Sequence, residues 1–143
     1  MVHGSEENNA VEMRALEYAG VDRRTASNEA LSLRVFTVNF AIAMSLDNVK
    51  KKEAVLDRFY KNLMSAFGEN SEIWEVLQSR LGAYSEAVKT LPTSVRASSV
   101  GKTFAALCGS AESAITIDIG SAIFDNNYKL VSESIIAINI VME

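Results

Sequence analysis

The sequence has few of the residues on which enzymes and metal sites most often depend. Among 143 residues it contains one histidine, His3, and one cysteine, Cys108. A catalytic triad, a cysteine and histidine pair and an HExxH zinc site all need a histidine inside the folded part of the chain. A single thiol forms neither an internal disulfide nor a cysteine-based zinc site. We therefore expect a non-enzymatic protein with no catalytic residues, no bound metal and no cofactor.

Long apolar runs and a basic surplus are also lacking. The most apolar stretch, residues 135–142, is far shorter than the ~20 residues that a membrane-spanning helix needs. The chain has 18 acidic and 14 basic residues and a net charge of −4, whereas nucleic-acid binding domains are basic. The best basic run, residues 50–61, is interrupted by Glu53 and Asp57, so we interpret it as a solvated helix face. The sequence predicts a protein with neither a membrane span nor a nucleic-acid partner.

The N-terminal residues 1–9 lack the basic start and the apolar stretch of a signal peptide. We expect a cytoplasmic protein by default, and a secreted one if a signal peptide has been removed. Residues 1–9 are predicted to form a disordered tail, and residues 10–143 to form a single helical domain, because no repeat or linker divides the chain.

Large apolar side chains recur at helical intervals through most of that domain. In residues 47–67, Leu56, Leu63 and Phe67 share one face, Asp47 is the expected cap, and Gly68 follows as the end. A second helix is predicted from residues 70 or 71 up to Pro92, with apolar side chains at intervals of four, four, three, four and three: Ile73, Leu77, Leu81, Tyr84, Val88 and Leu91. Residues 10–18 and a segment from Thr93 or Ser94 to Gly109 are predicted as further helices.

Two segments fit either a helix or a strand. In residues 28–45, Phe36, Val38 and Phe40 alternate with polar or small residues, yet Leu31, Val35, Val38 and Ile42 have helical spacing. The isoleucine-rich last third is equally ambiguous. We predict two helices there, separated by a turn near residues 125–127. The predicted fold is an all-α bundle or orthogonal array of five to seven helices, and the alternative is an α+β fold with strands at about 34–45, 114–124 and 134–142.

Small residues in several predicted helices carry a resemblance to a known family. Residues 97–100 (Ala-Ser-Ser-Val), 113–115 (Ser-Ala-Ile), 121–124 (Ser-Ala-Ile-Phe) and 134–135 (Ser-Ile) resemble patterns in the helical, non-repetitive modules of spider silk proteins, with a looser similarity at residues 63–68. The resemblance implies a helical structural module. This chain departs from that family in carrying far more charge.

Strong amphipathic helices without catalytic chemistry favour a non-enzymatic module that associates with a protein, most simply with itself. A large ring beside an apolar stripe either covers the core or anchors a partner. We therefore select Trp74, Tyr60 and Tyr84 as the candidate partner or oligomer surface.

Two alternatives stay open. The first is a carrier or sensor of a small apolar ligand, with a pocket inside the bundle lined by Phe36, Phe40, Phe59, Phe104 and Ile119. The second is an unusual enzyme using carboxylates that the fold brings together, for example Asp118, Asp125 and Glu133.

Overall fold

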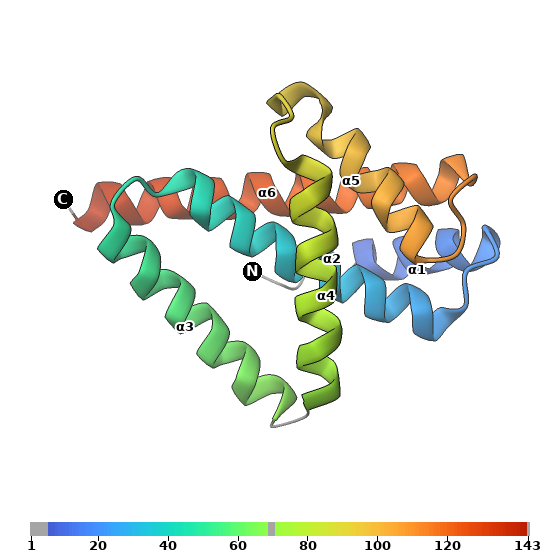
Figure 1. Ribbon diagram of the computed structural model, residues 1–143, viewed down its shortest axis with the longest axis horizontal. Coiled ribbons are helices and arrows are strands. Elements are labelled where there is room, and N and C mark those ends of the chain that lie inside the picture. Colours follow the sequence, from blue (N-terminus) through green and yellow to red (C-terminus); the bar gives the residue numbers. More distant parts are fainter. Residues whose placement is uncertain (1–5, 69–70, 143) are drawn as a thin grey trace.

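The computed structural model describes residues 6–68 and 71–142, in which the secondary structure consists of six α-helices (Figure 1). In chain order they are α1 (Glu6–Tyr18), α2 (Arg23–Ser45), α3 (Val49–Phe67), α4 (Ser71–Val88), α5 (Thr93–Leu107) and α6 (Ala114–Met142). No strand occurs in these two ranges. The all-α prediction is confirmed, and the α+β alternative is wrong.

The last helix, α6, is continuous, so the predicted turn at residues 125–127 is wrong. Asn127 is buried, and its side-chain Nδ2 donates to the carbonyl oxygen of Ile123 at 2.7 Å, one turn earlier in the same helix. Ile123, Phe124 and Val131 are buried on both sides of this point. Burial of this face outweighs the low helix propensity of the asparagines.

The first helix begins at Glu6, four residues before the predicted start at residue 10, and residues 1–5 of the predicted tail lie outside the described residues. Leu16 is fully buried in the main core, and the Arg34 guanidinium of α2 donates to the carboxylate of Glu12. An apolar contact and an ion pair therefore hold α1 against α2.

Glycine and polar caps define the helix ends. Gly68 has a φ of 71° after α3, in the left-handed region that glycine adopts without steric cost, which confirms the predicted end. At the start of α3, Asn48 and not Asp47 is the cap, since the Asn48 side chain accepts a hydrogen bond from the Lys51 backbone N–H at 3.1 Å. Helix α4 ends at Val88, and Pro92 is the N-cap residue of α5.

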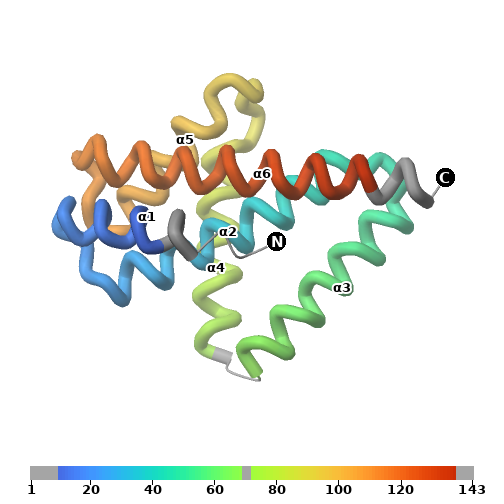
Figure 2. Tube along the Cα trace, turned by 180° about the vertical axis from the view of Figure 1, so that it is seen from behind, coloured from blue at the N-terminus to red at the C-terminus, as the bar shows by residue number. Residues whose placement is uncertain are grey.

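The centre of the molecule is a pair of long helices, α2 and α6, which lie side by side and run in the same direction (Figures 1 and 2). Their rings meet at Phe36 and Phe124, with centroids 6.4 Å apart, and the hydroxyl oxygens of Ser45 and Ser132 lie 3.2 Å apart. Both segments that were ambiguous in sequence are thus helices with well-buried faces, which pack on each other and, for α6, also extensively on α5.

Helix α5 packs closely against α6. A Cβ atom added to Gly101 would lie 2.4 Å from the backbone oxygen of Ile117, and one added to Gly120 would lie 2.8 Å from the Phe104 side chain. The Ser121 hydroxyl donates to the carbonyl oxygen of Ala97 at 2.8 Å across the same contact. These small residues are what allow the close approach of the two helices.

Candidate protein association surface

Helices α3 and α4 extend from the α2–α6 pair, and the end of α3 lies near the start of α4 at a common tip (Figures 1 and 2). Their inner faces pack on α2, with Leu63 of α3 and Leu77 of α4 buried in one cluster with Val35. Nearer the body, Phe59 packs against a second cluster that joins α2 to the end of α6. The outer faces of α3 and α4 are exposed to solvent.

All three predicted surface residues lie on this pair of helices, and two of them, Tyr60 and Trp74, are half-buried in the same cluster. The Tyr60 hydroxyl donates to Asn39 Oδ1 of α2 at 2.9 Å, and partial burial raises the pKa of this hydroxyl. The indole Nε1 of Trp74 is buried and has no hydrogen-bond partner within the described residues. Both rings help to hold α3 and α4 on α2, and a role in binding a partner stays a prediction.

The third predicted surface residue, Tyr84, is fully buried, so it belongs to the core and not to a surface, contrary to the prediction. Its ring stacks on Phe36 with centroids 5.3 Å apart. Burial raises the pKa of its hydroxyl well above the ordinary value, and the negative charge of Glu29 adds to this effect. Helix α4 buries this residue because its inner face is covered by α2 and α5 together.

An ion pair joins Arg80 of α4 to the buried Glu29 of α2. Cys108 is part of the same electrostatic environment, and burial raises the pKa of its thiol to about 12, with Glu29 as a smaller cause. A thiol that stays protonated at neutral pH is a poor nucleophile. We therefore interpret Arg80 and Glu29 as a structural ion pair and Cys108 as a small buried side chain whose thiol is not activated as a nucleophile.

A basic stripe runs along the exposed face of α3. We define it as Lys50, Ala54, Arg58 and Lys61, which follow one another at intervals of four, four and three residues and are all exposed. No carboxylate in the described part of the chain lies within ion-pair distance of the three charged members. Their positive charge therefore faces solvent.

An acidic stripe runs along the exposed face of α4. We define it as Glu75, Ser79, Gly82 and Glu86, at intervals of four, three and four residues, all exposed. Glu86 lies 3.9 Å from the Lys89 ammonium, and both side chains are more than two-thirds exposed. Such a surface pair contributes little and exchanges readily with solvent or a partner. Figure 1 shows α4 crossing in front of α2 and α6 with no helix over its near side.

The sequence contained the signal for both stripes, namely the same three-and-four spacing that predicted the helices. The run at residues 50–61 was interpreted only as a solvated face, and the polar face of residues 71–88 was not considered as a surface for a partner. Only the structure shows which side of each helix is covered.

Two open hollows lie beside α1 and the start of α2, one of about 380 Å³ and one of about 610 Å³. Arg23 lines both of them, and the other lining residues are mostly charged or polar. None of the five residues expected around an apolar ligand lines either hollow. Phe36 and Phe104 are fully packed in the core, and Phe59 belongs to the clusters between α2 and α3. Neither hollow therefore supports an apolar ligand site.

The three carboxylates considered for an unusual enzyme all lie on α6 and are exposed, and they are Asp118, Asp125 and Glu133. Within the described ranges, no cluster of three or more histidine, cysteine or carboxylate side chains is placed to hold a metal ion. Nor is any described helix both long and apolar enough to cross a membrane.

Comparison of the chain with protein-family models, with curated proteins and with solved structures found no match.

Proposed function

We propose that this chain is a non-enzymatic helical module whose role is to associate with further copies of itself. The observation that carries the proposal is the separation of opposite charges onto different helices. Helix α3 carries five basic residues and two acidic ones, a net charge of +3, in a chain whose overall charge is −4. Helix α4 carries three glutamates and one arginine, and that arginine is already paired with Glu29.

A second copy is the partner that fits this pattern best. Each molecule carries a basic face and an acidic face, so two copies are electrostatically complementary without any further component. A polyanion such as a nucleic acid would be attracted by α3 but repelled by the acidic surplus of the rest of the chain.

Apolar side chains beside the charged faces add to the attraction. Val49 and Met64 on α3 are 64% and 52% exposed, and Val76 on α4 is 45% exposed. Burying such side chains between two molecules contributes about 25 cal/mol per Å² of apolar surface. Charge then sets which faces meet, and apolar contact adds affinity.

Sedimentation velocity of the whole chain over a concentration series tests the proposal. At about 0.05 M salt we expect the average mass to rise with protein concentration, and at about 0.5 M salt we expect it to fall towards that of the monomer, because salt screens exposed charges. A chain that stays monomeric at both salt concentrations, up to about 0.3 mM protein, contradicts the proposal, since weak complexes of this kind are detectable there.

A further inference from the structure

We infer that the basic stripe on α3 of one copy docks on the acidic stripe on α4 of a second copy, with the two helices antiparallel. This inference rests on the proposed self-association and specifies its interface. Each stripe is defined by exposed residues on one helix face, and each faces away from the core of its own molecule.

The two stripes have the same length. Lys50 and Lys61 are eleven residues apart, and so are Glu75 and Glu86. At 1.5 Å of rise per residue both pairs of charges are about 16 Å apart along their helix axes. In an antiparallel alignment Lys50 lies opposite Glu86 and Lys61 lies opposite Glu75, so both ends form ion pairs at once.

The same alignment places small residues opposite each other in the middle. Ala54 then faces Gly82, one turn from Ser79. A Cβ atom built on Gly82 meets no other atom within 4 Å, so the space over this glycine is open. The axial distance between packed helices depends on the side chains at the point of contact, and small residues there let the helices approach closely.

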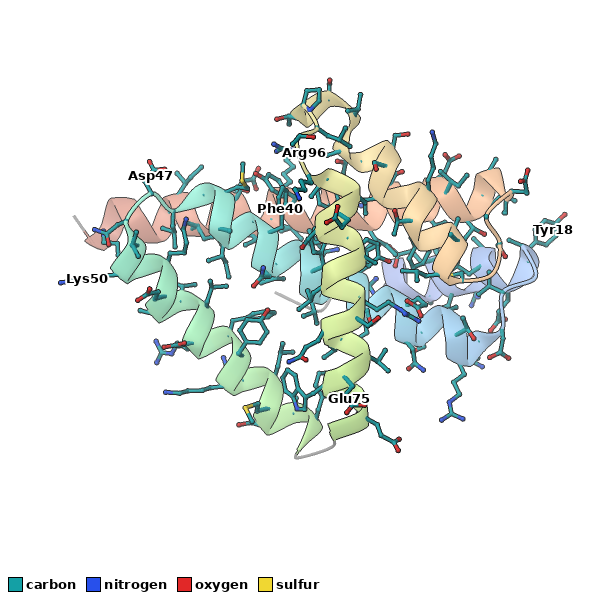
Figure 3. The ribbon with its side chains drawn as sticks, in the orientation of Figure 1. Tyr18, Phe40, Asp47, Lys50, Glu75 and Arg96 are labelled. Carbon is teal, nitrogen blue, oxygen red and sulfur yellow. The ribbon has the colours of Figure 1, made fainter. Side chains whose placement is uncertain are left out.

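Within the described residues no ion pair joins the two stripes of one molecule. Lys50 lies at the start of α3, at the end of the helix remote from the tip, and Glu75 lies on α4 near the tip (Figure 3). Figure 1 shows the two helices diverging from that tip. Each copy therefore keeps both stripes available, and α3 of one molecule meets the α4 stripe of the next.

Docking between unlike faces has a consequence for the assembly. A contact of this type is heterologous, so each copy can bind one neighbour through α3 and another through α4, which gives a ring or an open chain. A contact between two single helices is smaller than a standard protein interface of about 1,600 Å², so the association is weak and transient.

Charge-swap variants of the full chain test the docking. In Lys50→Glu/Lys61→Glu both stripes are acidic, and in Glu75→Lys/Glu86→Lys both are basic. We expect each variant alone to self-associate at least about 30-fold more weakly than the natural chain at low salt, because like charges then face each other. An equimolar mixture is expected to recover association, since every α3 then finds an α4 of opposite charge in the other variant.

Matched controls separate the stripes from net charge. Lys102→Glu/Lys129→Glu has the same net charge as the first variant, and Glu112→Lys/Glu133→Lys has the same net charge as the second, with all four positions exposed and outside the stripes. The controls are expected to associate like the natural chain. Circular dichroism and thermal unfolding of every variant verify that the fold is intact.

The outcomes distinguish the two proposals. A natural chain that is monomeric at low salt overturns the proposed function and the docking together. A natural chain that associates, with swap variants that associate equally well or a mixture that stays monomeric, overturns the docking alone. Weakening by each swap with recovery in the mixture supports both.

Discussion

Arg80 of α4 donates to the carboxylate of Glu29 on α2 through both Nε and Nη2, over distances of 2.8 to 3.0 Å. The Glu29 side chain is 7% exposed and that of Arg80 is 26% exposed. This pair joins α4 to α2 one turn from the buried Tyr84, on the face of α4 that α2 and α5 cover.

Breaking this ion pair is expected to destabilise the fold unequally from its two sides. Arg80→Ala leaves a buried carboxylate without its partner, and we expect a loss of about 3 kcal/mol in the free energy of unfolding. Glu29→Ala is expected to cost less, because the partly exposed Arg80 side chain can turn to water. Urea unfolding of both variants and of the double variant measures the coupling, and an equal or greater loss for Glu29→Ala contradicts this interpretation.

Removing the Tyr84 hydroxyl is expected to leave stability unchanged or raise it by up to about 1 kcal/mol, since burial without a hydrogen bond is unfavourable. This hydroxyl has no hydrogen-bond partner in the described ranges. Tyr84→Phe keeps the ring stacked on Phe36. Tyr60→Phe is the matched control, and it is expected to cost about 1 kcal/mol because it removes the hydrogen bond to Asn39. A loss greater for Tyr84→Phe than for Tyr60→Phe, measured by urea unfolding, would count against the observed packing.

The free energy of unfolding is expected to fall above pH 9. The pKa of Cys108 is about 12 in the folded chain against an ordinary value of 9.0, so the unfolded state releases its proton first as the pH rises. The stability that this group contributes is complete below pH 9 and is lost between pH 9 and 12, at up to about 1.4 kcal/mol per pH unit. Urea unfolding from pH 8 to 10, below the range in which the tyrosine hydroxyls titrate in the unfolded chain, measures the slope, and Cys108→Ala is expected to flatten it. An identical slope in that variant rules out the thiol as the cause.

Two glycines on different helices are expected to respond in opposite directions to alanine. Gly101→Ala places a methyl group against the Ile117 backbone and Ser121, and is expected to cost about 3 kcal/mol through overpacking. Gly82→Ala meets open space on an exposed helix face, and is expected to stabilise the monomer by about 0.5 to 1 kcal/mol. Thermal unfolding of the two variants at high salt measures both effects on the monomer. A tolerated Gly101→Ala contradicts the close approach of α5 and α6.

The cap of α3 provides a local test. Asn48→Ala is expected to cost about 1 kcal/mol, because it removes the side-chain acceptor for the Lys51 N–H. Asp47→Ala is expected to change stability by less than about 0.5 kcal/mol, since surface positions without such a contact are tolerant. Chemical unfolding of the two variants measures both losses of stability. A larger loss for Asp47→Ala than for Asn48→Ala would show that Asp47 is the cap, as the sequence predicted.

Local spacing explains which parts of the fold were predictable. Helices α3 and α4 were predicted almost to their ends, because each buries one face and is bounded by Gly68 or followed by Pro92. The turn at residues 125–127 was predicted wrongly, because the low helix propensity of Asn127 is a local property and does not reflect the packing that buries this residue. Tyr84 was placed on a surface because a ring at a helix edge is covered or exposed according to neighbours far away in the sequence.

The sequence by itself determined the helices at residues 47–67 and 71–88 and the charge gathered at residues 50–61, because these properties depend on residues within one or two turns of each other. For residues 28–45 and the last third it favoured helices but left strands open. Only the tertiary structure decided that α6 is unbroken, that Tyr84 is enclosed, and that Lys50 and Glu75 are on separate open faces. Those features follow from contacts between distant segments, and the free energy of such contacts depends on which faces meet in space.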